Sequence, residues 1–242
     1  MPSARHHAHP VRLLPVLAPL WLAVAAHADV GATLSLQSDA RERGVSYSAD
    51  KPAAQLGLAW DGEGGGYAGA ALARARFDNG RSSAWLRAYG GRVVELRAGL
   101  DAEAGVVLHR FESISRYDHV EFYAGLLGER WNLRLHHAPD HYGSGQRTVY
   151  GEINLRWPLA DRVAAVGHVG ALRSSGGARW ASQGYGGRQD PTRIDLRAGV
   201  SWQLGEHAEW QLAWVSASRG GPVMWTASSR RQSAVLGLSL AF

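Results

Sequence analysis

The sequence predicts an all-β chain that closes into a transmembrane, antiparallel, up-and-down β-barrel of about twelve strands, within a range of about ten to fourteen. The first observation is that apolar and polar residues alternate over segments of about ten residues. The second is that charged residues recur in the middle of the polar faces. The third is an export signal at the amino terminus, after which no apolar run is long enough for a membrane helix. Such a chain can span a membrane only as a closed barrel.

The amino terminus has the layout of a secretory signal peptide. Arg5 and Arg12 come before an apolar stretch at 13–26, which ends near an Ala-His-Ala cleavage pattern. The alternative is a retained anchor, but the stretch is short beside the roughly 20 apolar residues of a membrane helix. We therefore expect a signal peptide over 1–28 and a barrel over 29–242.

Composition narrows the chemistry of the chain. It contains no cysteine, which excludes disulfide bonds, thiolate metal sites and cysteine nucleophiles. The 26 basic and 21 acidic residues are dispersed along the sequence, so we expect no nucleic-acid partner. Nothing in the sequence requires a cofactor, and we expect none.

Period-two alternation places the individual strands. In the clearest segment, Ile194, Leu196 and Val200 lie on one face. Asp195 and Arg197 lie on the other face, which must line something wet or ion-paired. A water-soluble sandwich would share the alternation, but not this recurrence of charge at mid-strand. The expected strands, about twelve in number, lie near residues 31–38, 52–60, 66–77, 82–94, 97–112, 118–128, 130–138, 147–157, 162–173, 192–204, 208–218 and 231–242.

The connections between these segments alternate in length, as they do in a barrel with long outer loops and short inner turns. Every expected outer loop except 78–81 is at least as long as any inner turn. The expected outer loops are 39–51, 78–81, 113–117, 139–146, 174–191 and 219–230. The expected inner turns are 61–65, 95–96, Glu129, 158–161 and 205–207.

Aromatic residues fall near the ends of the expected strands, where a membrane–water interface favours them. The inner rim is expected to carry Trp60, Trp131, Trp157, Trp202 and Trp210. The outer rim is expected to carry Phe77, Phe111, Tyr150 and Trp214. A soluble sheet would more often bury such residues at mid-strand in its core.

The last segment ends in an apolar face formed by Leu238, Leu240 and the terminal Phe242. A terminal Phe on an amphipathic strand is similar to the signal by which outer-membrane proteins are handed to the barrel-assembly machinery. We therefore expect that machinery as a partner during biogenesis and outer-membrane lipids as the final surroundings.

Polar positions of the strands define a candidate lumen. The residues expected to point inward are Arg74, Arg76, Arg87, Arg134, Glu152, Asn154, Arg156, Asp195, Arg197 and Gln203. Facing arginines and acids would set a transverse field across a narrow channel for small solutes, with a weak preference for anions. Alternatively, these arginines and acids pair with one another and block the lumen. The barrel would then have a structural role, or an adhesive role through loop 174–191.

Two catalytic or metal-binding interpretations are weaker. A barrel lipid hydrolase needs a Ser and a His within hydrogen-bond reach, and His141 and Ser144 share a loop, but no spacing demands that pair. His136, His137, Asp140 and His141 are close enough in sequence to suggest a zinc or copper site. Neighbouring residues of a strand point to opposite faces, so His136 and His137 cannot both chelate unless the strand has ended. We assign no catalytic or metal residue.

The chain also resembles a proteobacterial family of conserved hypothetical proteins, the TorF-type porins or Gcw_chp. The opening motif consists of Arg43, Gly44, Val45, Ser46, Ser48, Lys51, Pro52, Ala53, Gly66, Tyr67, Ala68 and Gly69. Further segments similar to the family are HHAPDHYGSG at 136–145, GHVG at 167–170 and DPTRIDLRAGVSW at 190–202. The resemblance implies an outer-membrane barrel of porin type, with no established substrate.

Changing Phe242 to Ser should reduce insertion into the outer membrane, because the closing strand loses its terminal apolar group. Outer-membrane fractionation and immunoblotting would measure the steady-state level, with Phe122→Ser, in the expected strand at 118–128, as a control that leaves the last strand intact. Normal levels of the Phe242→Ser protein would contradict the assignment of the terminal residue as an assembly signal.

Overall fold

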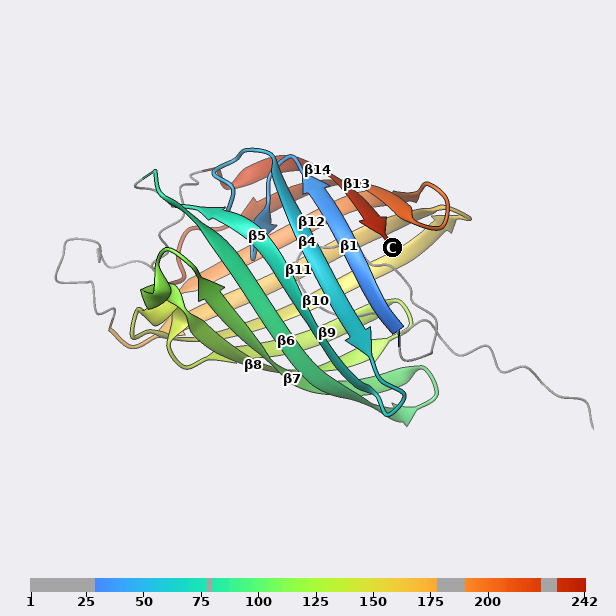
Figure 1. Cartoon of the computed structure of the whole chain (residues 1–242), viewed down its shortest axis with the longest axis horizontal. Helices are drawn as coiled ribbons and strands as arrows, with labels where there is room; N and C mark the ends of the chain where they lie inside the picture. The colour runs from blue at the N-terminus through green and yellow to red at the C-terminus, as the bar shows by residue number, and fades with distance from the viewer. Residues whose placement is uncertain (1–28, 78–79, 178–189, 223–229) are drawn as a thin grey trace, which may run out of the picture.

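The computed structural model describes residues 29–77, 80–177, 190–222 and 230–242. The expected signal peptide at 1–28 lies outside these residues. Twelve strands form one closed antiparallel barrel in which sequence neighbours are spatial neighbours (Figure 1). No helix within the described ranges is long and apolar enough to cross a membrane. The predicted fold class and the expected number of strands are confirmed.

The barrel strands agree with the predicted segments to within a few residues. They are β1 (Asp29–Gln37), β4 (Ala53–Asp61), β5 (Gly66–Arg76), β6 (Ser82–Arg97), β7 (Leu100–Phe111), β8 (His119–Gly128), β9 (Trp131–Ala138), β10 (Arg147–Ala160), β11 (Val163–Ser175), β12 (Thr192–Gln203), β13 (Ala208–Ala217) and β14 (Gln232–Ala241). The connections carry a small hairpin, β2 (Arg41–Glu42) and β3 (Val45–Ser46), and two 3₁₀ turns, η1 (Ser115–Tyr117) and η2 (His141–Gly143).

Two inner turns differ from the predicted ones because the strands continue through irregularities. The β6–β7 pairing shifts between Glu95 and Arg97, so that β6 extends across the expected turn at 95–96. The β10–β11 pairing shifts between Pro158 and Ala160. Proline cannot donate a ladder hydrogen bond, and a shift of register accommodates it within a strand.

The barrel is closed by its first and last strands. β1 pairs with β4 on one side and with β14 on the other, with Thr33 opposite Ala241. Ala32 and Phe242 exchange backbone hydrogen bonds at 3.0 and 3.2 Å. The apolar side chains of the last strand, those of Leu238, Leu240 and Phe242, lie on the outward face, and that of Phe242 is exposed.

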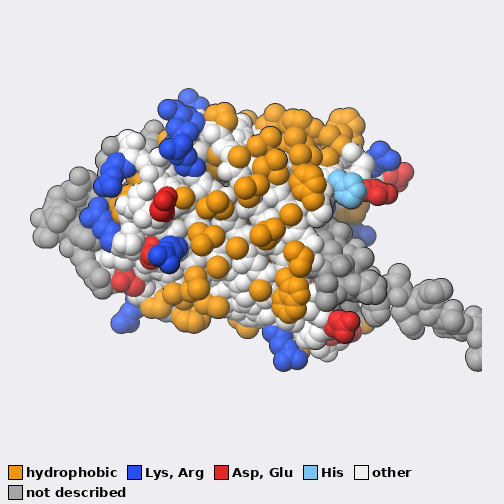
Figure 2. Space-filling view, in the orientation of Figure 1, with side chains coloured by type: hydrophobic (Ala, Val, Ile, Leu, Met, Phe, Trp, Pro, Cys, Tyr) orange, Lys and Arg blue, Asp and Glu red, His pale blue; other side chains and the backbone are white. Residues whose placement is uncertain are grey.

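The outer surface of the barrel is apolar. Leu58 and Leu135 lie in the middle of their strands, and each is 58% exposed. Apolar side chains cover the middle of the visible wall, whereas charged side chains lie towards its ends (Figure 2). A closed barrel with such a surface needs hydrocarbon around it, so the chain is a transmembrane barrel.

A tryptophan girdle marks the rim that carries the short turns. Trp60, Trp157 and Trp202 lie at the strand ends there and point outward. Trp210 is the cross-strand neighbour of Trp202, and Trp131 begins β9 at the same rim. These positions agree with the predicted inner rim.

At the opposite rim the prediction was only partly correct. Trp214 points outward, as expected. Phe77, Phe111 and Tyr150 are almost fully buried and point into the barrel. They pack against loops that fold into the lumen, a contact that strand periodicity cannot reveal.

The two faces of β12 allow a matched test of the strand register. Leu196→Arg places a charge in hydrocarbon near the midplane of the bilayer. It should lower the free energy of unfolding by about 2–4 kcal/mol. Arg197→Ala, one residue away on the lumen face, should leave folding nearly unchanged. Urea titration of the refolded protein, followed by heat-modifiable gel migration, measures the stability of both variants. Equal destabilisation by the two changes would contradict the assignment of faces.

Candidate functional site

The first outer connection folds into the lumen. We call residues 38–52, which include β2 and β3, the lumen hairpin. Arg41 holds it together, because its guanidinium is fully buried between Asp39 at 2.5 Å and Asp50 at 2.8 Å. The same side chain donates to the backbone carbonyls of Gly44 and Arg230. The hairpin is therefore braced internally and is tied to the last outer connection.

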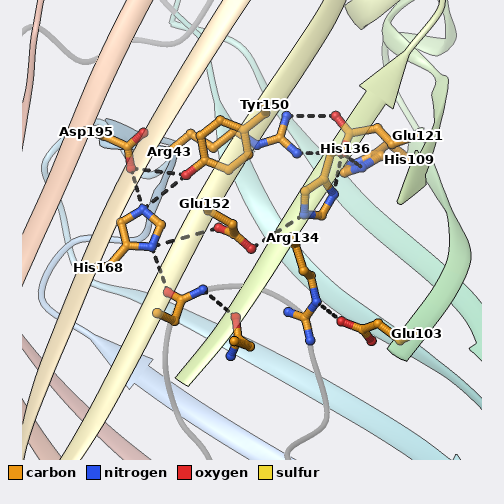
Figure 3. A network of polar contacts seen from close by, with 12 residues as sticks. Arg43, Glu103, His109, Glu121, Arg134, His136, Tyr150, Glu152, His168 and Asp195 are labelled. Atoms are coloured by element: carbon orange, nitrogen blue, oxygen red, sulfur yellow. Dashed lines mark hydrogen bonds and ion pairs between the residues drawn. The ribbon is translucent and has the colours of Figure 1, made fainter. Parts of the chain in front are cut away.

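The tip of the lumen hairpin crosses to the far wall. Arg43 donates two hydrogen bonds to Glu121 of β8, at 2.8 and 2.6 Å. Its guanidinium also lies 4.4 Å from the ring centroid of Tyr150, on β10. A bidentate pair and a cation–π contact together fix the orientation of the guanidinium. The guanidinium of Arg43 thus lies between Tyr150 and Glu121 (Figure 3).

Gly44, beside Arg43, permits the close approach of the tip. Its φ of +75° lies in the left-handed region, and a Cβ there would meet the Cβ atoms of Ala217 and Asp195 at 2.5 and 2.8 Å. Those two residues belong to β13 and β12. Only glycine fits both the backbone angle and the space.

An aromatic cluster fills the outer end of the barrel. Tyr47 of the lumen hairpin stacks on Trp85 at 4.5 Å between ring centroids and is hydrogen-bonded to Tyr142 of η2. Phe111 and Tyr117 pack against the same group. Three separate outer connections thus meet inside the lumen and narrow it.

Beneath this cluster, four histidines surround one carboxylate. The histidine–glutamate cluster consists of His109, His119, Glu121, His136 and His141. A ring nitrogen of each histidine lies 3.8 or 3.9 Å from a carboxylate oxygen of Glu121. Burial lowers the pKa of His141, on the 3₁₀ turn η2, well below its usual range, so this imidazole is neutral.

A second polar network continues across β10, β11 and β12. The ring of His168 lies 2.8 Å from Asp195 and 2.7 Å from Asn154. Glu152 lies between His168 at 3.8 Å and His136 at 3.5 Å, and so joins this network to the histidine–glutamate cluster (Figure 3). Charges on neighbouring strands are therefore arranged in one continuous band.

Most predicted lumen arginines point inward and have polar partners. Arg134 pairs with Glu103, and Arg156 pairs with Glu209 at 2.5 Å. Arg87 lies 3.6 Å from Glu42 of the hairpin. Burial raises the pKa of Glu42, and the charge of Arg87 opposes that rise.

The remaining predicted positions on the polar faces are also placed by the structure. Arg197 donates to the amide oxygen of Gln211 at 3.4 Å, a neutral partner. Asn154 also donates to Asn132 at 3.0 Å. Gln203 is partly buried and shares strand parity with Asp195 and Arg197.

Arg74 and Arg76 do not point into the lumen, and this corrects the sequence prediction. Their strand parity is that of the outward-facing Leu72, and Arg74 donates to the half-buried Ser82 at 2.9 Å. The sequence prediction assigned this face to the lumen by charge, although Leu72 lies on the same face and indicates contact with lipid. Near the outer end of a strand, however, an outward arginine is clear of hydrocarbon.

The hydrolase and metal interpretations can be checked against the same geometry. Ser144 donates its hydroxyl to the backbone carbonyl of His141, not to the imidazole. His137 is exposed on the outward face, whereas His136 points inward to the histidine–glutamate cluster. His137 therefore cannot join the predicted group, whereas His136 and His141 do meet, at Glu121 of β8.

The fold and site together define a class of protein. A closed antiparallel barrel with an apolar exterior and a charged interior is a transmembrane β-barrel of the outer-membrane type. Residues 23–235 match the family described as "Bacterial protein of unknown function (Gcw_chp)", and the chain belongs to that family. No curated protein sequence matches the chain.

Solved porin structures are similar in fold. The KdgM porin matches with a TM-score of 0.54 at 10% identity, over 88% of this chain and 99% of the porin. The NanC porin matches with a TM-score of 0.53 at 10% identity, again over 88% of this chain and 99% of that chain. The KdgM porin in complex with disordered oligogalacturonate matches with a TM-score of 0.50 at 10% identity. The match covers 88% of this chain and 98% of that chain. At such identity the likeness concerns the fold.

Gly44→Ala should release the lumen hairpin from the wall, because the new Cβ collides with β12 and β13 in a strained backbone conformation. Amide exchange over 40–50 should accelerate at least about tenfold, and trypsin should cleave after Arg41 and Arg43. Gly64→Ala is the matched control, because a Cβ at Gly64 meets nothing within 4 Å. Unchanged exchange over 40–50 in the Gly44→Ala protein would rule out tight docking of the tip.

Proposed function

We propose that this chain is a non-enzymatic outer-membrane channel for small solutes, with a constriction formed by the lumen hairpin. The single observation that carries the proposal is the band of charged side chains across the interior of a closed, lipid-facing barrel. A structural barrel of this size could fill its interior with apolar side chains, whereas charged groups held in a lumen supply the field that selects ions and solutes.

A weak preference for anions is the finer part of the proposal. Arg134 and Arg156 are neutralised by their carboxylate partners. Arg197 instead has the neutral Gln211 as its hydrogen-bond partner, which leaves a positive charge on the lumen wall. The likeness in fold to porins is compatible with this preference, since the KdgM porin has been solved in complex with oligogalacturonate.

Location and assembly partners follow from the same surface. The apolar belt supports outer-membrane lipids as the surroundings. The outward Leu238, Leu240 and Phe242 lie on the strand that closes the barrel, which supports our expectation of recognition by the barrel-assembly machinery.

A non-conducting, structural or adhesive barrel is the second candidate, and the aromatic cluster favours it. Tyr47, Trp85 and Phe111 are buried at the outer end of the lumen. If the hairpin never leaves this position, solutes would be blocked there. The two candidates differ in whether the intact protein conducts.

Planar-bilayer recording of the refolded mature protein distinguishes the channel from the non-conducting barrel. The wild type should show small unitary steps, and replacement of residues 39–50 by a short Gly-Ser linker should enlarge them, because the constriction is removed. If both heat-modifiable proteins fail to conduct, the channel proposal is wrong. Steps of equal size in both would instead show that the hairpin is not the constriction.

Ion selectivity tests the role of Arg197. In asymmetric KCl, Arg197→Gln should shift the reversal potential away from anion preference, because the lumen loses a positive charge whose hydrogen-bond partner is the neutral Gln211. Arg74→Gln removes the same charge from the outward face and should leave the potential unchanged. A shift of equal size in both variants would contradict a local effect in the lumen.

A further inference from the structure

The register of two strands brings three potential metal ligands together. His109 of β7 lies directly opposite His119 of β8, and their rings stack at 4.2 Å with an interplanar angle of 5°. Glu121 follows His119 by two residues and therefore shares its inward face. One ligand atom from each of the three lies within 4.8 Å of the others, and all three residues are buried.

The turn η2 supplies a fourth imidazole. Nδ1 of His141 lies 3.8 Å from Oε1 of Glu121, and Nε2 of His119 lies 3.9 Å from the same oxygen. Donor atoms of a tetrahedral zinc site lie about 3.4 Å apart, given metal–ligand distances of about 2.0–2.1 Å. The His–Glu121 distances would have to shorten by about half an ångström, and the widest separation among the three buried ligand atoms, up to 4.8 Å, by as much as about 1.4 Å. Rotation of the imidazole and carboxylate side chains can supply such movement.

The hydrogen bonding of the imidazoles leaves lone pairs for an ion. Nδ1 of His119 lies 2.9 Å from the carbonyl oxygen of Tyr117, to which it must donate. This fixes the tautomer, so the Nε2 lone pair faces Glu121, as in the carbonyl-oriented histidines of metal sites. Within the described part of the chain, neither ring nitrogen of His109 or His141 has a hydrogen-bond partner. Buried polar atoms without partners are rare and point to an absent ligand.

The carboxylate of Glu121 can accept hydrogen bonds from Arg43 and bind a metal ion at the same time. Each carboxylate oxygen has two acceptor sites, and the guanidinium of Arg43 occupies one on each oxygen. His109 and His141 approach the carboxylate from β7 and η2, and His119 approaches it from two residues earlier on β8, so the remaining acceptor sites face the imidazoles. Imidazole and carboxylate ligands together suit zinc and its first-row neighbours.

We propose that His109, His119, Glu121 and His141 form a binding site for one divalent transition-metal ion, with Zn²⁺ as the representative. The site joins two barrel strands to an outer turn inside the lumen. It requires only the folded barrel, so it stands whether or not the barrel conducts.

Titration of the refolded, tag-free mature protein in detergent tests the proposal. Calorimetry with Zn²⁺ should give one equivalent per chain, and Co²⁺ should give the intense visible absorption of a four-coordinate site. His109→Gln and His119→Gln should each weaken Zn²⁺ binding by more than about tenfold, the loss typical even of an outer-sphere partner. Absence of both binding and the Co²⁺ band in the wild type would overturn the proposal.

Two controls separate this site from surface histidines. His137→Gln and His207→Gln change exposed imidazoles and should leave affinity unchanged. Equal losses in these variants and in the cluster variants would overturn the proposal. Arg43→Gln should raise Zn²⁺ affinity, because a positive charge beside Glu121 is removed; an unchanged affinity would mean that the ion binds elsewhere.

A measurement on the wild type alone covers the case in which a histidine variant fails to fold. X-ray absorption of the Zn²⁺-loaded protein counts imidazole ligands by their outer-shell scattering. Scattering from two or three imidazole ligands would support the proposed site. A spectrum without imidazole scattering would overturn the proposal.

Discussion

The ion pair between Arg43 and Glu121 joins an outer loop to the far wall of the barrel, and the interior is organised around it. Both side chains are withdrawn from water, so each would be strongly destabilised without the other. Docking of Arg43 places Gly44 against β12 and β13 and allows Tyr47 to stack on Trp85. The same carboxylate is the centre of the four histidines. One contact therefore positions the constriction and the most chemically distinctive group of residues together.

The strands could be predicted because the bilayer requires apolar side chains and the lumen requires polar ones, and alternate residues of a strand face the two environments. Leu196 and Arg197 show this directly, since a slip by one residue would place the arginine in hydrocarbon. The inner tryptophans were predictable for a related reason, since the interface is the place where an amphipathic ring is most stable. The family assignment rests on motifs along the whole chain and agrees with the fold.

The candidate site was less accessible to sequence reasoning. Arg74 was misplaced because its charge was taken as the mark of the lumen face, whereas Leu72 on the same face of the strand faces outward. Glu121, His109 and His119 were not singled out, because their meeting depends on the pairing register of β7 and β8. A search for inward polar residues on neighbouring predicted strands could have found the two histidines. Nothing in the pattern of a loop indicates that it turns inward, so Arg43 could not have been placed opposite Glu121.

The seam between β1 and β14 constrains the order in which the chain acquires its structure. Thr33 and Ala241 are partners although almost the whole chain separates them, so closing the seam carries the largest loop-closure entropy of any pairing in the wall. Every strand between them can form a hairpin with its predecessor, but both edges stay open until the last strand arrives. An unclosed sheet exposes unpaired backbone groups that invite aggregation. Folding must therefore be slow at its final step, and the chain depends on protection of its two edges until that step is complete.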